Sequence, residues 1–328
     1  MDRISLSLGS GGKLMRDFLR EGVLKHFGNE YLNKLADSTH IELSGKIGFT
    51  TDSFVITPLF FPGGDIGRLS VAGTVNDLVV SGIRPGFLSL SLIIEEGFPV
   101  NDLELIFRSI KKALQEAGVE IVTGDTKVVR KGEADGIYIN TAGIGKVIAE
   151  PAELNNGDPI VITGSPGDHS VAIMVARGEF TFDGEDIKSD CQPLNDLLPL
   201  WGRGVKWMRD ITRGGLATIL CELAEAESVA VSIEESDVPF SPPVRAASEI
   251  LGIDPFYLAS EGKAVLVVAP KSADEILRYL KTLEYGKESR IIGKIGGIGK
   301  NGELVLKTIS GGLRIMEPLT GELLPRIC

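Results

Sequence analysis

The chain has 328 residues, of which 43% are hydrophobic and 24% charged, and its formal net charge is −11. This length exceeds what one ordinary hydrophobic core organises and fits two domains of roughly 150 residues each. The negative charge disfavours nucleic acid, and no apolar run approaches the length of about 18 residues that a membrane helix needs, so we expect neither nucleic-acid nor membrane binding.

The first 40 residues are predicted to form a glycine-rich arm and a helix. Residues 9–13 (Gly-Ser-Gly-Gly-Lys) precede a run in which apolar side chains recur at helical spacing. The amides of Gly11 and Gly12 and the ammonium of Lys13 would form an anion site at the helix start, but a flexible arm with a solvated lysine explains these residues equally well. The spacing is not that of a Walker A loop. Residues 1–5 lack the apolar region of a signal peptide, so we expect a cytoplasmic protein.

Residues 41–147 are predicted to form one α/β unit. The expected elements are strands at 47–51 and 54–56, a helix at 66–81, a strand around 88–94 whose apolar residues share one face, a helix from an Asn101 cap to 117, and strands at 119–123 and 137–147. Asp52 would then lie at a strand edge, Asp77 inside an apolar helix, and Asp125 just after the end of a strand.

These three aspartates are the candidate metal ligands. An aspartate is costly to bury without a partner, and Asp77 stands among valines and a leucine. Mg²⁺ binds a few carboxylates and completes its shell with waters and phosphate oxygens, so Asp52, Asp77 and Asp125 together predict a magnesium–nucleotide site. For any one of them alone, a local cap or salt bridge is the better explanation.

A linker at 151–158, rich in proline, asparagine and glycine, is predicted to lead to a second α/β unit. The expected elements are a strand at 159–163, a turn at 164–169, a helix to 177, a helix at 214–226, strands at 264–268 and 304–306, and a helix at 273–283. Residues 297–302 match GxGxxG, but strands flank them, so we interpret them as a turn. The predicted organisation is an arm at 1–40, domains at 41–150 and 151–312, and a tail at 313–328.

Two stretches of the second unit carry candidate chemistry. Thr212, Arg213, Gly214 and Gly215 stand at the start of a helix, where a guanidinium and exposed amides would bind phosphate. An N-cap by Thr212 is the competing explanation, and both could hold. Glu261 interrupts an apolar stretch, and it is either a surface turn residue or a general base whose pKa is raised by burial.

The tail ends in a thiol, Cys328. A frayed end could carry this thiol to a partner and back into a pocket of its own protein, although the cysteine could also lack any role. The adjacent α-carboxylate disfavours the thiolate and Arg326 offsets this only in part, so the thiol would need an activated acyl donor or a pocket that desolvates the carboxylate. The three cysteines are odd in number and widely spaced, which argues against disulfides. With three histidines and no CxxC pair, a zinc site has little support.

Several of these motifs together resemble one family. Residues 49–53, 73–78, 123–129 and 210–216 are similar to the PurM-like ATPases, and residues 11–15, 189–194 and 325–328 are similar to the HypE family of hydrogenase maturation factors within that superfamily. The resemblance spans nearly the whole chain; Ile211 departs from the proline that related proteins often have. It implies a two-domain α/β fold in which the N-terminal sheets of a homodimer pair into a barrel and the C-terminal domain is a mixed sheet with helices.

The resemblance also implies a reaction. HypF would carbamoylate Cys328, ATP and Mg²⁺ would drive dehydration of the thiocarboxamide to a thiocyanate, and the cyanide would pass to iron on the HypC–HypD complex. Lys127 would stabilise the carbonyl or transfer phosphate, Glu261 would take protons, and ATP would contact the three aspartates, residues 212–215 and residues 11–13. Two other classes stay open: a non-catalytic thiol carrier or scaffold, and a PurM-like small-molecule synthetase or kinase.

Overall fold

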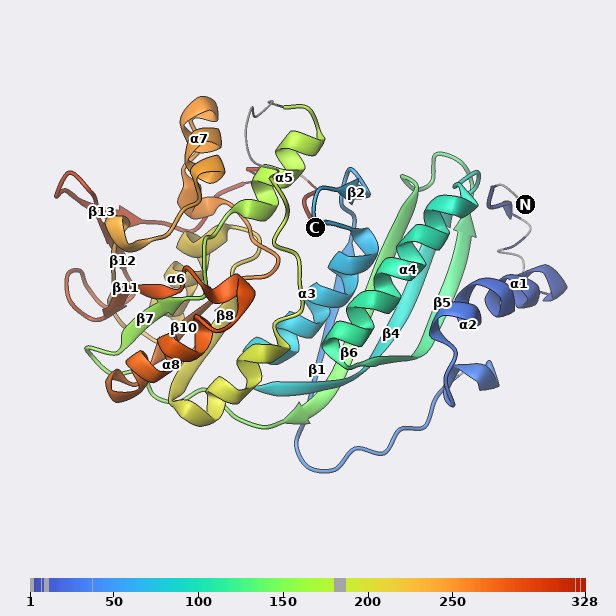
Figure 1. Cartoon of the computed structure of the whole chain (residues 1–328), viewed down its shortest axis with the longest axis horizontal. Helices are drawn as coiled ribbons and strands as arrows, with labels where there is room; N and C mark the ends of the chain where they lie inside the picture. Colours follow the sequence, from blue (N-terminus) through green and yellow to red (C-terminus); the bar gives the residue numbers. More distant parts are fainter. Residues whose placement is uncertain are drawn as a thin grey trace.

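The computed structural model describes residues 3–6, 8, 12–36, 38–179, 187–321, 323–324 and 326–328. Within them, a four-stranded and a seven-stranded sheet lie side by side along the long axis of the molecule (Figure 1). A short ribbon of β2 (Phe60–Phe61) and β3 (Gly64–Asp65) accompanies the two sheets. Gly11, which the sequence places in an anion-binding loop, lies outside the described residues.

The N-terminal arm contains the helix that the apolar spacing predicts, with one widened turn. It consists of α1 (Gly12–Phe18), a π-helical turn (Leu19–Val23) and α2 (Leu24–Phe27). Phe27 packs edge-on against Phe107 of the first domain, with 5.3 Å between ring centroids. This contact anchors the arm to the body of the protein.

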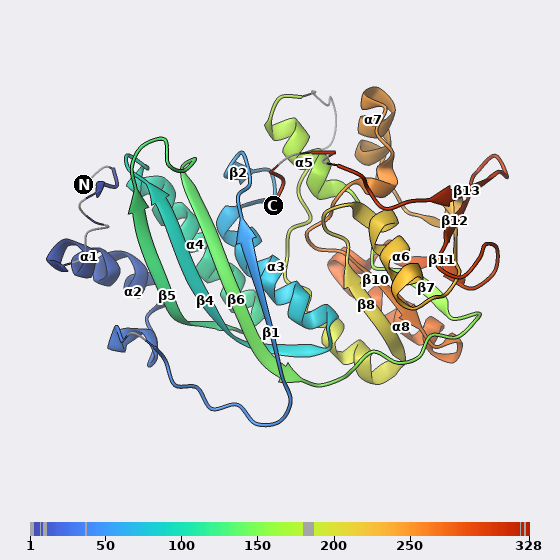
Figure 2. The same ribbon diagram turned by 180° about the vertical axis from the view of Figure 1, so that it is seen from behind.

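The four-stranded sheet has the order β1 (Ile47–Phe54), β6 (Ile137–Val147), β4 (Ile83–Glu95) and β5 (Glu120–Val129), and only the β4–β5 pair is parallel. The helices α3 (Ile66–Val80) and α4 (Val100–Ala117) cover one face, whereas the face turned toward the viewer in Figure 2 has no helix over β1, β6 and β4. Leu88, Leu90, Leu92 and Ile94 are all buried, which confirms the predicted alternation along β4.

Three boundaries differ from the predictions. β1 is one unbroken strand because all its residues pair with β6, so Asp52 lies within a strand and not between two. β5 continues past Asp125, since its parallel pairing with β4 persists to the end of both strands. α4 begins after Pro99, which caps it without a side-chain hydrogen bond, so Asn101 belongs to the first helical turn and is not the cap.

The seven-stranded sheet has the order β13-β12-β9-β11-β7-β10-β8, and only the β12–β9 pair is parallel. Its strands are β7 (Pro159–Ile162), β8 (Val205–Asp210), β9 (Val231–Glu234), β10 (Ala264–Val268), β11 (Arg290–Ile295), β12 (Leu304–Lys307) and β13 (Leu313–Met316), and its helices are α5 (Asp168–Ala176), α6 (Gly215–Ala226), α7 (Pro242–Leu251) and α8 (Ala273–Leu280). Residues 297–302 form turns and bends between β11 and β12, which confirms their interpretation as a turn.

A shared hydrophobic core joins the two sheets. Successive residues of β10 alternate between two cores: Leu266 belongs to a core that includes Leu88 of the first sheet, whereas Val265 belongs to a core that includes Leu216 of α6. The second sheet is therefore buried on both faces, and the junction between the sheets is packed with side chains. Groups at this junction are held by both halves of the chain.

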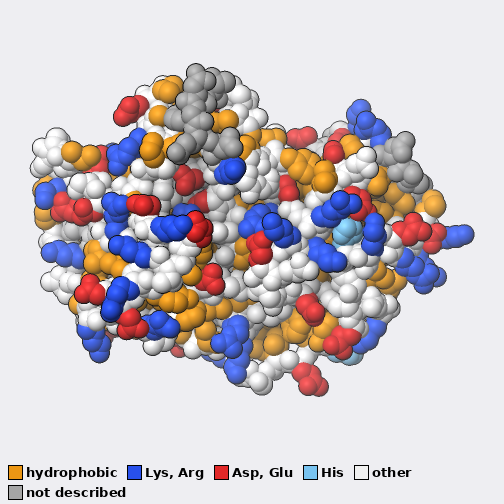
Figure 3. Space-filling model, in the orientation of Figure 1, with side chains coloured by type: hydrophobic (Ala, Val, Ile, Leu, Met, Phe, Trp, Pro, Cys, Tyr) orange, Lys and Arg blue, Asp and Glu red, His pale blue; other side chains and the backbone are white. Residues whose placement is uncertain are grey.

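The surface is mixed in charge. Figure 3 shows acidic and basic side chains interspersed over one face of the molecule, without a large area of a single sign. No helix in the described part of the chain combines the length and apolarity that crossing a bilayer requires.

Candidate functional site

The C-terminal tail is docked at the junction of the two sheets, where Figures 1 and 2 mark the chain end beside β2. It runs next to the segment that follows β1: the amide of Val55 donates to an α-carboxylate oxygen of Cys328 at 3.2 Å, and the amide of Thr57 donates to the carbonyl of Arg326 at 3.1 Å. Arg177 of the second domain also donates to the carbonyl of Arg326, at 2.8 Å. Both halves of the chain therefore hold the tail.

The thiol of Cys328 lies against a guanidinium. Its Sγ is 2.9 Å from Nη2 of Arg213. Burial and then the nearby Glu261 carboxylate raise the pKa of the Cys328 thiol to about 11, against the opposing effect of Arg213. The raised pKa agrees with the expectation from the sequence that Cys328 does not readily form a thiolate, but its main cause is burial. Arg326 is not the cation beside the thiol, because it pairs with Asp135 at 2.5 Å.

Asp52 lies near enough to Cys328 for its charge to raise the pKa of the thiol, and Asp77 and Asp210 lie near Asp52. Asp52 projects from the helix-covered side of β1, and Asp77 of α3 accepts a hydrogen bond from Thr50 Oγ1 at 2.8 Å. Burial, followed by the charge of Asp77 and a hydrogen bond to it, raises the pKa of Asp52 to about 6. Burial, then the charges of Asp77 and Asp52, raises the pKa of Asp210 at the end of β8 to about 7. A cation at this position would relieve the repulsion between these acids.

The chemistry of this pair of carboxylates fits a magnesium ion that shares its shell with phosphate. Among the described residues, no group of three or more histidines, cysteines or acids could hold a metal ion alone. Mg²⁺ does not need such a group, because it is usually bound through one or two carboxylates with phosphates and waters as its other ligands. Asp52 and Asp77 are therefore the residues of this chain that fit the ion, and Asp210, to which the sequence analysis gave no role, adds to their negative field.

The start of α6 lies next to the thiol. Gly214 caps this helix with a φ of 85°, a left-handed conformation that favours glycine, and no side chain caps the helix. The predicted alternative of a Thr212 N-cap is therefore wrong: Thr212 contributes its carbonyl, which accepts from the amide of Gly215 at 2.9 Å. A cavity of about 150 Å³, lined by Arg213, Gly214 and Cys328 among others, adjoins this uncapped end.

Glu261 is buried, so its interpretation as a surface turn residue is wrong. It lies in the loop before β10, with only 3% of its surface exposed, and its Oε1 has no hydrogen-bond partner in the described structure. Burial, then the charges of Asp210, Asp190 and Asp52, raises the pKa of Glu261 well above its ordinary value. A buried carboxyl group with a raised pKa beside a thiol is placed to exchange protons with a group on that thiol.

Four predicted site residues lie elsewhere in the single chain. Asp125 is paired across the sheet, through Ser91 and Asn140, with Ser53, the residue after Asp52. Successive residues of a strand point to opposite faces, so Asp125 projects from the face opposite to that of Asp52. Asp125 and Lys127 are exposed and form an ion pair of 3.0 Å on β5, three strand spacings or about 14 Å from β1.

Lys13 is exposed on α1, at the β5 end of the molecule (Figure 1). A cavity of about 290 Å³ separates the arm from β5 there, and Met15, Asp125 and Lys127 are among its lining residues. The fold therefore divides the predicted site residues between two places. Asp52, Asp77, residues 212–215, Glu261 and Cys328 meet at the junction, whereas Asp125, Lys127, Gly12 and Lys13 lie near β5.

Known proteins match the chain over both domains. The model described as AIR synthase related protein, N-terminal domain, matches residues 36–147, and the corresponding C-terminal domain model matches residues 155–305. A protein of Bradyrhizobium diazoefficiens, carbamoyl dehydratase HypE, is 44% identical over 99% of this chain and 96% of its own. A crystal structure of the hydrogenase maturation protein HypE in complex with ATP has a TM-score of 0.94 at 40% identity, over 99% of each chain. A structure of a HypE–HypF complex has a TM-score of 0.79 at 44% identity, over 92% of this chain and 99% of that one.

Proposed function

The chain belongs to the HypE family of carbamoyl dehydratases, and we propose that it converts a carbamoyl group, carried as a thiocarboxamide on Cys328, into a thiocyanate with the use of ATP. The product supplies the cyanide ligand for the iron of a [NiFe]-hydrogenase. One observation carries the proposal: the last residue of the chain places its thiol within 2.9 Å of Arg213, beside a buried carboxyl group and two carboxylates that fit a magnesium–nucleotide complex.

The reaction needs ATP because a carboxamide oxygen is a poor leaving group. The carboxamide oxygen attacks the γ-phosphorus, the bond from that phosphorus to the bridging oxygen breaks, and ADP leaves. The nitrogen then loses its two protons while the carbon–oxygen bond breaks, so phosphate departs and the carbon–nitrogen triple bond forms. In the overall balance, thiocarboxamide and ATP give thiocyanate, ADP, phosphate and one released proton, the other nitrogen proton being retained on phosphate.

Glu261 and Arg213 have the positions that these steps require. Glu261 takes protons from the nitrogen, since its burial and raised pKa make its carboxylate a stronger base than an exposed one. Arg213 contacts the sulfur that bears the carbamoyl group, so its guanidinium is placed to hold the negative charge of the phosphoryl group that the carbamoyl oxygen accepts. Asp52 and Asp77 would hold Mg²⁺, which would neutralise phosphate charge.

We also propose that a second copy of the chain completes the site. Asp125 and Lys127 share the open face of the four-stranded sheet with Phe49 and Ile93, which are 69% and 43% exposed. Phe49 and Ile93 lie apart on the same open face, and a sheet face that no helix covers and that exposes large apolar side chains favours a protein contact. Pairing this face in a homodimer would cover them and is the arrangement in which Lys127 could act on a carbamoyl group.

The chemistry of the thiol also constrains the partners. A docked Cys328 is half-buried beside Arg213, so we propose that loading and delivery involve partners that meet the tail outside, with HypF as the carbamoyl donor and HypC–HypD as the cyanide acceptor. The similarity to the HypE–HypF complex supports the donor. The three cysteines are free thiols, which fits the reducing cytoplasm as the location.

The direct test uses the whole protein, carbamoylated on Cys328 and incubated with ATP and Mg²⁺. We expect intact-mass and peptide analysis to show loss of one water from the tail peptide, with ADP and phosphate formed in equal amounts. An adduct that keeps its mass while ATP is bound would support the thiol carrier instead.

Replacement of Asp77 by asparagine is expected to weaken binding of Mg-ATP. The loss of one ligand carboxylate should cost at least the roughly 10- to 100-fold that loss of an outer-shell partner costs in other metal sites. The protein should still fold, because the substitution keeps the shape of the side chain and removes one of two repelling acids. Titration calorimetry measures the affinity, with Asp237→Asn, at an exposed position, as the control. Equal affinities in the two variants would remove Asp77 from the nucleotide site.

A further inference from the structure

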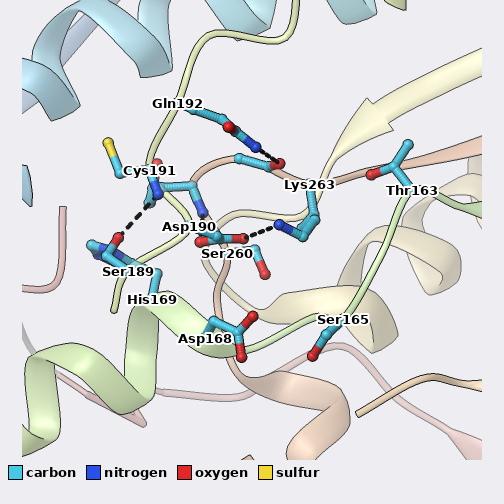
Figure 4. Close-up of polar contacts among 12 residues, drawn as sticks. Thr163, Ser165, Asp168, His169, Ser189, Asp190, Cys191, Gln192, Ser260 and Lys263 are labelled. Atoms are coloured by element: carbon cyan, nitrogen blue, oxygen red, sulfur yellow. Dashed lines mark hydrogen bonds and ion pairs between the residues drawn. The ribbon is translucent and has the colours of Figure 1, made fainter. Parts of the chain in front are cut away.

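Residues 189–192, whose motif is similar to the HypE maturation factors, take no part in the steps above, yet they contact both the tail and the loop of Glu261. Figure 4 shows Ser189, Asp190, Cys191 and Gln192 between α5, which carries His169, and the loop that carries Ser260 and Lys263. Ser189, Asp190 and Cys191 are buried.

One end of this segment holds the tail through His169. Nε2 of His169 lies 2.6 Å from the carbonyl oxygen of Ile327, and Nδ1 lies 2.8 Å from Oγ of Ser189. Since a carbonyl only accepts, Nε2 carries the proton and Nδ1 accepts from the hydroxyl of Ser189. The amide of Cys191 donates to the same Oγ at 3.1 Å, which leaves the hydroxyl hydrogen for the ring. Burial lowers the pKa of His169, so the ring stays neutral and keeps this arrangement.

The other end fixes the backbone of Glu261. Oδ1 of Asp190 accepts from the amide of Glu261 at 2.9 Å, and the amide of Gln192 donates to the carbonyl of Glu261 at 3.3 Å. Gly262 is so close that a Cβ there would lie 1.9 Å from the carbonyl oxygen of Asp190. The second oxygen of Asp190 pairs with the buried Lys263 at 3.6 Å. The backbone of Glu261 therefore cannot move unless residues 190–192 move with it.

A third contact ties the segment to the nucleotide side. The amide nitrogen of the Asn76 side chain donates to the carbonyl of Gln192 at 3.1 Å, and its oxygen accepts from the amide of Leu194 at 2.8 Å. Asn76 precedes Asp77 in α3. One short segment thus contacts the elements that carry the thiol, the base and a metal ligand.

We propose that residues 189–192, acting through His169, are a positioning element that sets the docked thiol of Cys328 at a fixed place relative to Glu261. This inference rests on the proposed function, because it assigns the segment to the same dehydration. His169 is a positioning residue: it holds the backbone one residue before the thiol and touches no reacting atom. This role accounts for the polar residues of the segment: Ser189 orients the His169 ring, and Asp190 and Gln192 hold the backbone of Glu261.

The test compares His169→Phe with His169→Gln in the full-length protein. Phenylalanine keeps a ring against Phe61, whose centroid lies 5.4 Å from that of His169, but cannot donate to Ile327; glutamine offers an amide N–H in place of Nε2. Loss of this buried hydrogen bond should raise the rate of Cys328 alkylation by iodoacetamide about tenfold. In single turnover, the His169→Phe protein should dehydrate its carbamoyl group about tenfold or more slowly, since small displacements of reacting groups are costly. His169→Gln should restore both rates, and ATP affinity should stay unchanged in both variants.

Three outcomes would overturn the inference. Alkylation of His169→Phe at the wild-type rate would show that His169 does not hold the tail, and equal exposure in both variants would show that the donated hydrogen bond does not matter. If His169→Phe exposes the thiol but dehydrates at the wild-type rate, the position of the docked tail does not affect the reaction. If His169→Phe does not fold, Ser189→Ala replaces it, because that change frees the ring without removing it. Alkylation does not depend on dehydration, so a wild-type protein that fails to dehydrate would refute the proposed function while the docking measurement still stands.

Discussion

Replacement of Cys328 by alanine is expected to abolish thiocyanate formation and to leave ATP binding intact. The sulfur carries the carbamoyl group, and neither other cysteine can substitute: Cys191 and Cys221 are buried, and burial raises the pKa of both thiols, that of Cys221 to about 11. ATP binding survives because the alanine removes only the sulfur from the site. Mass spectrometry of the tail peptide and titration calorimetry with Mg-ATP measure the two properties.

Cys221→Ala is the matched control, because Cys221 does not line the tail pocket and its Sγ donates to the carbonyl of Met316 at 3.5 Å. That variant should form thiocyanate normally. Full ATP turnover on a small molecule by Cys328→Ala would instead favour a PurM-like synthetase or kinase, in which the tail has no chemical role.

Glu261→Gln is expected to slow dehydration by about 10²- to 10⁴-fold, the usual contribution of a positioned acid–base group. The amide keeps the shape of the side chain and cannot take a proton. Because burial raises the pKa of Glu261, the wild-type group is protonated at low pH and becomes a base only as pH rises through that raised pKa. The single-turnover rate should therefore rise with pH in the wild type, and the variant should lose this rise.

The exposed Glu225 of α6 provides the control for this change. Glu225→Gln should dehydrate at the wild-type rate, and carbamoylation of Cys328 by the donor should proceed in both variants. A Glu261→Gln protein that retains the rate and the pH dependence of the wild type would exclude Glu261 as the base.

The sequence predicted the parts of the fold that have strong periodicity. The alternation from Leu88 to Ile94 and the apolar helix around Asp77 are present as expected, because burial on one face leaves a repeat that can be read directly. Short strands such as β9 and β11 were not predicted. Each has only four to six residues in the structure and takes its stability from neighbouring strands, not from its own pattern.

The site was only partly predictable for a related reason. Residue type indicated that Asp52, Asp77, Arg213 and Cys328 carry chemistry, and the fold brings them together. Nothing in the local sequence shows on which face Asp125 projects, because a shift of pairing by one residue reverses the face, and β4 and β5 do have a register shift between Leu88 and Ser89. The burial of Glu261 likewise depends on packing against distant segments.

A sulfur at the very end of a chain is ordinarily open to oxidants, soft metals and mixed disulfides, all of which react with the thiolate. With its pKa raised to about 11 in the docked position, the thiol of Cys328 is almost wholly protonated at neutral pH. In the docked position the sulfur is therefore held as an unreactive thiol. Release of the chain end should make Cys328 reactive both toward its carbamoyl donor and toward oxidants. We therefore expect oxidation of Cys328 to occur mainly in the released state.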